Sequence, residues 1–271
     1  MAMFETNGVN IYYEDLGNKD SKNCVVFFNG AMSTVSSWQL LYPIFEKMGW
    51  RVVLQDFKGQ FKSDKPAGPY TFEAHANEAY SLFKHLGLEQ VHVIGTSYGG
   101  RVAMEFAILH PEITASISLI NSLSELNTLS ETIFKSWEAI RVAENGESFF
   151  WNAVPILYGK TFIANNKEEC VSRAKFMGER ATEYFDGKKL IFDNLLSNVY
   201  VTDRLCKITC PTLVVCGEED ILTPVALSEI IVQQIPHAEF VTIPDCGHST
   251  LIEKPKELES IIFGFVMKHT F

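Results

Sequence analysis

The sequence has little that would support a metal site, a disulfide framework or nucleic-acid binding. Its six cysteines are scattered among 271 residues without a C-x-x-C pair, which is typical of buried, reduced thiols. The sequence contains neither an H-x-x-x-H motif nor the paired Cys/His spacing that would predict a metal centre. The net charge of -10 opposes nucleic acid as the main partner, because binding phosphate backbones requires clustered Lys and Arg. We therefore expect no metal, no cofactor and no nucleic acid.

Long hydrophobic runs are also missing. The longest apolar runs, such as residues 25–28, are far too short to cross a bilayer. Residues 1–10 lack both the basic segment and the apolar core of a secretory signal. We expect a cytoplasmic protein without membrane insertion. The sequence leaves its oligomeric state open.

Apolar runs alternate with helical patterns along most of the chain. Strands are predicted at residues 9–13, 24–28, 51–55, 91–94, 116–120, 213–216 and 239–243, and helices at 37–48, 72–86, 101–109, 225–235 and 256–268. This alternation favours an α/β fold with a mostly parallel sheet flanked by helices.

The alternation stops between residues 123 and 205, where helical segments and loops occur without a convincing core strand. We predict a helical cap at 123–205, inserted into a core formed by 1–122 and 206–271. Ligands bind at the carboxyl edge of open α/β sheets, so the cap is expected to cover a site there. It carries 12 acidic and 10 basic residues, and this near balance favours a neutral or apolar substrate.

Residues 95–99 read Gly-Thr-Ser-Tyr-Gly, a G-x-S-x-G pattern between a predicted strand and a predicted helix. A serine hydroxyl is a weak nucleophile unless it is exposed, held still and paired with a base. A sharp strand-to-helix turn provides the first two, and Gly95 and Gly99 remove side chains that would collide there. We predict Ser97 as the nucleophile. A Gly-rich nucleotide-binding turn is disfavoured, because the spacing is not G-x-G-x-x-G.

A serine nucleophile needs a base. His248 follows Gly247 on the loop after the strand at 239–243. That position lies at the same edge of the predicted sheet as Ser97, so we predict His248 as the base. The other six histidines are interpreted as structural or exposed.

The base in turn needs an acid that orients it. Glu218, Glu219 and Asp220 follow the strand at 213–216 and compete for this role. Asp220, directly before Ile-Leu-Thr-Pro at a predicted helix start, is the preferred candidate. A helix-capping carboxylate is the alternative interpretation of Asp220.

The order Ser, Asp, His, with the acid and the histidine after consecutive late strands, resembles the α/β-hydrolase superfamily. Residues 217–224 look like the acid loop of that family, and residues 247–248 look like its histidine loop. Residues 56–63 resemble its D-x-R-G-x-G-x-S segment, with Lys58 and Phe61 in place of the usual Arg and Gly. The resemblance implies the α/β-hydrolase fold for most of the chain.

Residues 29–32, Asn-Gly-Ala-Met, occupy the place of the family's H-G-x-x oxyanion loop. By that resemblance, the backbone N–H groups of Ala31 and Tyr98 would bind the oxyanion. Asn29 replaces the usual His, and is either a turn former or a residue with a specific polar role. The same stretch, with Thr34, also resembles acyltransferases that join hydroxyacyl chains, which keeps acyl transfer open.

These residues together predict a serine hydrolase that cleaves a small neutral or apolar carboxylic ester through an acyl-enzyme. Acyltransferases and carbon–carbon bond hydrolases share the triad and stay as alternatives. A non-catalytic binding protein on the same scaffold is the alternative from another class. A serine nucleophile argues against the haloalkane dehalogenase and epoxide hydrolase branches, which use Asp at that position.

Overall fold

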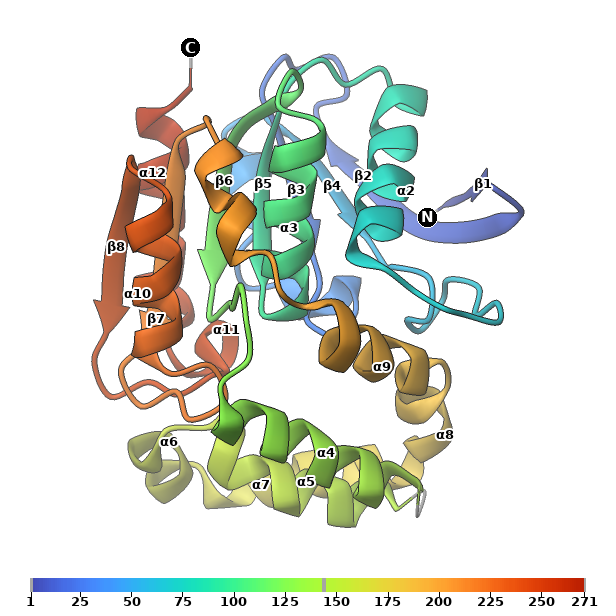
Figure 1. Ribbon diagram of the computed structural model, residues 1–271, viewed down its shortest axis with the longest axis vertical. Helices are drawn as coiled ribbons and strands as arrows, with labels where there is room; N and C mark the ends of the chain where they lie inside the picture. The colour runs from blue at the N-terminus through green and yellow to red at the C-terminus, as the bar shows by residue number, and fades with distance from the viewer. Residues whose placement is uncertain (1, 143–144, 271) are drawn as a thin grey trace.

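A computed structural model describes residues 2–142 and 145–270. Within them, the centre is an eight-stranded sheet in the order β1-β2-β4-β3-β5-β6-β7-β8 (Figure 1). The strands are β1 (Ala2–Thr6), β2 (Val9–Gly17), β3 (Cys24–Phe28), β4 (Arg51–Gln55), β5 (Val91–Thr96), β6 (Thr114–Ile120), β7 (Thr212–Gly217) and β8 (Ala238–Ile243). Strands β3 to β8 run parallel, whereas β2 pairs antiparallel with β1 and β4. The predicted α/β class with a mostly parallel sheet is confirmed.

Helices cover both faces of the sheet. On one face, α2 (Phe72–His85), α3 (Tyr98–Leu109) and α10 (Val225–Gln234) pack on alternate strand residues such as Val26 and Phe28. On the other, α1 (Pro43–Lys47) and α12 (Pro255–Lys268) pack on their neighbours Val25 and Phe27. Because helices cover both faces, the central strands β3 to β7 are buried at nearly every position.

Strand β1 is an element that the sequence analysis missed. Asn7 and Gly8 join it to β2, and both have positive φ, 51° and 76°. Asn-Gly is the favoured pair in a two-residue hairpin turn that needs positive φ at both positions. The Asn7-Gly8 dipeptide was therefore the sequence signal that could have predicted the β1–β2 hairpin.

The single helix predicted at 37–48 is wrong. The chain forms a 3-10 turn at Val35–Trp38 and only then α1, which starts at Pro43. Proline lacks the N–H that would continue a preceding helix but fits the first helical turn. The helix predicted to begin at Arg101 begins earlier, at Tyr98, directly after Ser97.

Between β6 and β7, the described residues form helices and loops and no strand. The helices are α4 (Thr128–Val142), α5 (Gly146–Leu157), α6 (Lys160–Asn165), α7 (Lys167–Glu179), α8 (Ala181–Phe185) and α9 (Lys188–Asn198), followed by a 3-10 turn at Thr202–Lys207. Helices α4 to α8 form an insertion beyond the carboxyl ends of β6 and β7, as in a cap (Figure 1). The domain boundaries at 122/123 and 205/206 stay a prediction.

A search of the described residues finds no helix that is both long and apolar enough to cross a membrane.

Candidate active site

Ser97 sits on the sharp turn that joins β5 to α3. Its φ of 52° and ψ of −117° lie in a region that is strained for a residue with a Cβ. A Cβ on Gly95 would collide with the backbone of Gly99 and Gly100, and a Cβ on Gly99 would collide with the Phe28 carbonyl group. The two glycines therefore allow the close backbone approach that this turn requires.

His248 is hydrogen-bonded to the predicted acid. Its Nδ1 lies 2.8 Å from Oδ2 of Asp220, which is 4% exposed. Asp220 also accepts the Thr223 N–H at 2.8 Å and the Asn121 amide at 2.7 Å. Since the carboxylate accepts from each neighbour, we infer that Nδ1 donates to Asp220. The lone pair of the imidazole is then on Nε2.

The two competing carboxylates do not bond to His248. Glu218 is exposed and accepts a hydrogen bond from Thr242 at 3.2 Å. Glu219 accepts the backbone N–H of Lys160 at 2.8 Å and pairs with its ammonium group at 2.7 Å. The geometry thus brings Asp220, rather than its neighbours, to His248.

Asn121 is a site residue that the sequence analysis missed. It follows β6 with a positive φ of 46°. Its side-chain Nδ2 donates to Asp220, and its side-chain Oδ1 accepts from the Thr250 hydroxyl, two residues after His248. Asn121 therefore links the acid loop to the segment after His248. The available signal was a polar residue directly after a buried strand, at the edge where ligands bind.

The two backbone groups predicted for the oxyanion hole lie beside Ser97. Tyr98 is the first residue of α3, so its N–H has no acceptor inside the helix. A Cβ built on Gly30 would lie 3.7 Å from the Ser97 Cβ, which places the loop containing Ala31 against the serine. Neither the Ala31 nor the Tyr98 N–H has a protein acceptor among the described residues.

Asn29 has a specific polar role rather than a turn-forming one. It is fully buried. Its amide donates to the Gln55 carbonyl at 2.8 Å and to Asp56 at 3.0 Å, and its oxygen accepts from the Trp38 indole at 2.8 Å. These bonds attach the start of the loop at residues 29–32 to the end of β4.

Gln60 and Asp56 hold the rest of that loop. The Gln60 amide donates to the Gly30 carbonyl at 2.8 Å, and its oxygen accepts the Phe57 N–H at 3.0 Å. Asp56 accepts the Val35 N–H at 2.9 Å and the Thr34 hydroxyl at 3.0 Å. Burial raises the pKa of Asp56 above its usual range, although these hydrogen bonds oppose the shift. Gln60 was missed in the sequence, where it occupies a variable position of the motif.

The two departures from the family motif also have structural partners. Lys58 pairs with the buried carboxylate of Glu78 at 2.5 Å. Phe61, in place of glycine, has a φ of 26° and packs edge-on against Tyr184 of α8, with the ring centroids 5.3 Å apart. Phe61 therefore connects the segment that holds the loop at residues 29–32 to the insertion.

Ser97 and His248 line one cavity of about 550 Å³, together with Gly30 and Ala31. Most of the lining side chains between β6 and β7 are aromatic: Phe134, Trp137, Phe149, Phe150, Tyr158, Phe176 and Tyr184 from α4 to α8 with the adjoining loop, and Phe192 from α9. Its described lining holds no Asp or Glu, and Arg173 is its one Lys or Arg. The cavity is therefore mainly apolar and excludes anionic protein groups.

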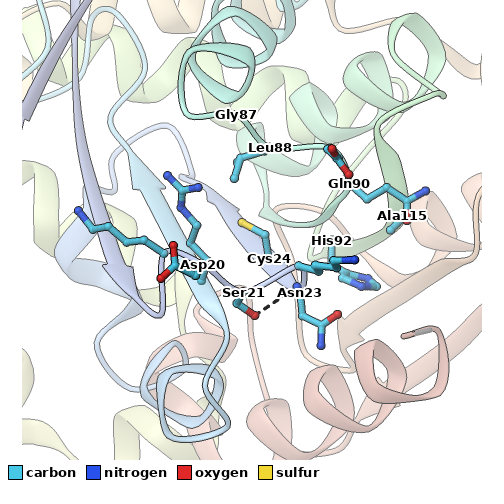
Figure 2. Close-up of a pocket in the computed structure, with 13 residues that line it drawn as sticks. Asp20, Ser21, Asn23, Cys24, Gly87, Leu88, Gln90, His92 and Ala115 are labelled. Atoms are coloured by element: carbon cyan, nitrogen blue, oxygen red, sulfur yellow. Dashed lines mark hydrogen bonds between the residues drawn. The ribbon is translucent and has the colours of Figure 1, made fainter.

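A second cavity, of about 430 Å³, lies at the amino ends of the strands (Figure 2). Cys24, the first residue of β3, and His92 of β5 line it. Burial raises the pKa of Cys24 to about 12 and lowers that of His92 to about 4. A thiol that stays protonated is a poor nucleophile. This cavity lacks the elements of nucleophilic catalysis.

Among the described residues, no group of three or more His, Cys, Asp and Glu side chains is arranged to hold a metal ion.

The fold defines an α/β protein with a helical insertion over the carboxyl edge of its sheet. A family model described as alpha/beta hydrolase fold matches residues 23–255. The chain belongs to this family.

Several known proteins are similar to it over nearly their whole length. A proline iminopeptidase of Lactobacillus helveticus is 26% identical over 287 aligned residues, covering 97% of this chain and 96% of that protein. An α/β-hydrolase enzyme from a Medee basin deep-sea metagenome library has a TM-score of 0.94 at 25% identity, covering 100% of this chain and 98% of that one. A thermophilic esterase from Thermogutta terrifontis shares the fold, with a TM-score of 0.85 at 24% identity and coverage of 99% and 97%. These similarities indicate a hydrolase and leave its substrate open.

Proposed function

We propose that the protein is a serine hydrolase that cleaves a small neutral or apolar carboxylic ester through an acyl-enzyme. The observation that carries the proposal is the shared cavity. Ser97, on a strained turn, and His248, bonded to Asp220 at 2.8 Å, line the same mainly apolar space. A nucleophile, a base and an orienting acid at one cavity are the requirements of acyl transfer to serine.

In the first half-reaction, the Ser97 Oγ attacks the ester carbonyl carbon as His248 Nε2 accepts its proton. The carbonyl oxygen becomes an oxyanion, which the N–H groups of Ala31 and Tyr98 stabilise. Asp220 stabilises the imidazolium form of His248. The tetrahedral intermediate then collapses, the C–O bond to the alcohol breaks, and His248 donates its proton to the leaving alkoxide.

In the second half-reaction, water attacks the acyl-enzyme while His248 accepts one of its protons. The new tetrahedral intermediate expels Ser97, which regains its proton from His248, and the free acid leaves. The hydrogen bonds of Asn29 and Gln60 fix the oxyanion loop before the substrate arrives. Donors that are fixed in advance need no reorganisation during the reaction.

The lining of the cavity favours an ester over a peptide with a free amino terminus. A protonated amine inside a protein requires a carboxylate partner. No Asp or Glu lines the described cavity, and the one fixed charge there is the cation of Arg173. We therefore place an uncharged acyl chain in the aromatic part of the cavity.

Acyl transfer to an alcohol and carbon–carbon bond cleavage use the same three residues and stay as alternatives. We prefer water as the acceptor, because no feature of the sequence marks a site for a carrier protein or coenzyme A. Cytoplasmic location likewise stays a proposal.

A fluorophosphonate probe and a panel of p-nitrophenyl esters test the proposal. We expect the probe to label the wild-type protein and not Ser97→Ala, and short acyl esters to be turned over only by the wild type. A folded wild-type protein that neither reacts with the probe nor hydrolyses any ester would instead be a binding protein on this scaffold. Cleavage of a vinylogous diketone without ester turnover would favour the carbon–carbon hydrolase.

A further inference from the structure

The insertion contacts the core beside both loops that carry the proposed base and acid. The contact is the amino end of α6, formed by Gly159 and Lys160 (Figure 1). The first N–H groups of a helix have no partner inside the helix and must be satisfied from outside. Here, two carboxylates of the core accept them.

Glu253, at the end of α11 (Thr250–Glu253), is the first of these carboxylates. One of its oxygens, Oε2, accepts the Gly159 N–H at 2.9 Å and also the Gly247 N–H at 3.0 Å. Gly247 directly precedes His248. A single carboxylate oxygen therefore joins the amino end of α6 to the histidine loop.

Glu219 is the second carboxylate, and it directly precedes Asp220. It accepts the Lys160 N–H at 2.8 Å and pairs with the Lys160 ammonium group at 2.7 Å. Its own N–H donates to the Cys246 carbonyl at 2.8 Å, which ties the acid loop to the histidine loop. The same helix end is thus held from both loops.

The backbones meet closely at this point. A Cβ on Gly247 would collide with Tyr158 and Gly159, and a Cβ on Gly159 would come within 3.1 Å of the Gly247 nitrogen. The Ser249 N–H donates to the Leu157 carbonyl at 2.9 Å, on the other side of His248. The residues on both sides of His248 are therefore fixed to the insertion.

We propose that Glu219 and Glu253 are positioning residues, which hold the amino end of α6 against the acid and histidine loops and thereby fix His248 relative to Asp220 and Ser97. The insertion then has two roles, since it lines the cavity and also orders the base. This inference rests on the proposed function, because it concerns the same base and acid.

The electrostatics of the two carboxylates fit this role. Carboxylates are stabilised near the positive end of a helix. The hydrogen bond with Lys160 lowers the pKa of Glu219. Burial raises the pKa of Glu253, although the backbone N–H groups of Gly247 and Gly159 oppose the shift. The other oxygen of Glu253, Oε1, is buried without a partner among the described residues. In a Glu253→Gln variant, the amide nitrogen can therefore take the place of Oε1 without breaking an existing hydrogen bond.

The test compares Glu253→Ala, Glu253→Gln, Glu219→Ala and the double alanine variant, using p-nitrophenyl acetate and a long acyl ester. Misplacing a catalytic group by about 1 Å costs up to roughly 100-fold in rate. We expect Glu253→Ala to lower kcat roughly 10- to 100-fold on both esters, with an unchanged KM for the acetate. Glu253→Gln should recover most of the loss, because its amide oxygen can accept both N–H groups.

Two further variants distinguish a positioning role of Glu219 and Glu253 from a general loss of stability. Glu218→Gln is the matched control, since Glu218 lies in the same loop but its side chain is exposed and accepts a hydrogen bond from Thr242 rather than from α6. This variant should keep wild-type kcat. Because both carboxylates hold one helix end, the double variant should lose less than the product of the two single losses.

The inference is overturned if the alanine variants change only the KM of the long ester, or only the melting temperature. It is also overturned if the two losses multiply independently. Should Glu253→Ala fail to fold, Glu219→Ala carries the test: it should lower kcat on both esters, and an unchanged kcat would overturn the inference. Failure of the proposed function is distinct, because the wild type itself would then be inactive.

Discussion

The two edges of the sheet differ in chemistry although the same strands form both. At the carboxyl edge, Ser97 and His248 line a cavity that is mainly apolar and covered by the insertion. At the amino edge, Cys24, Arg51 and His92 line a smaller cavity that is mainly polar (Figure 2). Each edge thus holds a hydroxyl or thiol side chain and an imidazole.

The edges differ in their hydrogen bonding, because Arg51 and His92 at the amino edge already have partners within the protein. Arg51 pairs with Asp15 at 2.9 Å, and His92 Nδ1 lies 2.8 Å from the Ser116 hydroxyl. At the carboxyl edge, the Ala31 and Tyr98 N–H groups have no acceptor among the described residues. Free donors beside a strained serine indicate a site built for a ligand, whereas satisfied groups indicate structure.

Ser97→Ala is the strongest test of this difference. Deleting a triad nucleophile costs on the order of 10³-fold or more in turnover, and removing one hydroxyl should leave the fold intact. We expect ester hydrolysis to fall by at least that factor, with an unchanged circular dichroism spectrum. Gln90→Ala, at the amino edge, should retain full activity. Near-normal turnover by a folded Ser97→Ala protein would falsify the assignment of the nucleophile.

Asp220→Asn tests which carboxylate serves His248. An amide cannot stabilise the imidazolium and favours the wrong tautomer, so we expect a loss in kcat of roughly 10³- to 10⁴-fold. Glu218→Gln should change kcat little, because Glu218 contacts Thr242 and not the histidine. Steady-state kinetics with one short ester measure both. Equal and mild losses at the two positions would show that the Asp220–His248 bond is not part of the reaction.

Gln60→Ala tests the support of the oxyanion loop. Gln60 is fully buried and donates to the Gly30 carbonyl. Leaving a buried partner without its hydrogen bond costs about 1–3 kcal/mol. We expect a lower melting temperature and a loss in kcat of roughly tenfold, because the Ala31 N–H loses its fixed position. An unchanged kcat in a variant of lower stability would mean that Gln60 only stabilises the fold.

The alternation of apolar runs predicted the fold and the positions of Ser97, Asp220 and His248 at one sheet edge, because each follows a strand whose apolar run is readable. Their catalytic roles stay predictions. The supporting residues Gln60 and Glu253 could not be predicted from the sequence, whereas Asn121 had one signal, its position directly after the buried strand β6. Each acts through partners far along the chain, as Glu253 does on Gly159, and no local pattern encodes such contacts. The error at 37–48 has a local cause instead, because Pro43 lacks the N–H that would continue a preceding helix and starts α1 afresh.

The smallest expected effect concerns the acyl chain. Each buried methylene contributes about 0.8 kcal/mol, and 1.36 kcal/mol corresponds to a factor of ten in rate. The kcat/KM of linear p-nitrophenyl esters should therefore rise roughly fourfold per methylene until the cavity of about 550 Å³ is full, and then fall.

Substitutions in the aromatic lining of the cavity should move that optimum. Phe192 lines the cavity, so Phe192→Leu should shift the optimum to longer chains. Trp151 is exposed and outside the lining, so Trp151→Phe should leave it unchanged. An optimum that both variants leave in place would mean that the acyl chain does not lie under the insertion.

The choice between hydrolysis and transfer is tested by measuring the free acid and the transfer product formed with and without an added hydroxyacyl acceptor. Dominant transfer at modest acceptor concentration would make the protein an acyltransferase, because an alcohol would then outcompete water for the acyl-enzyme.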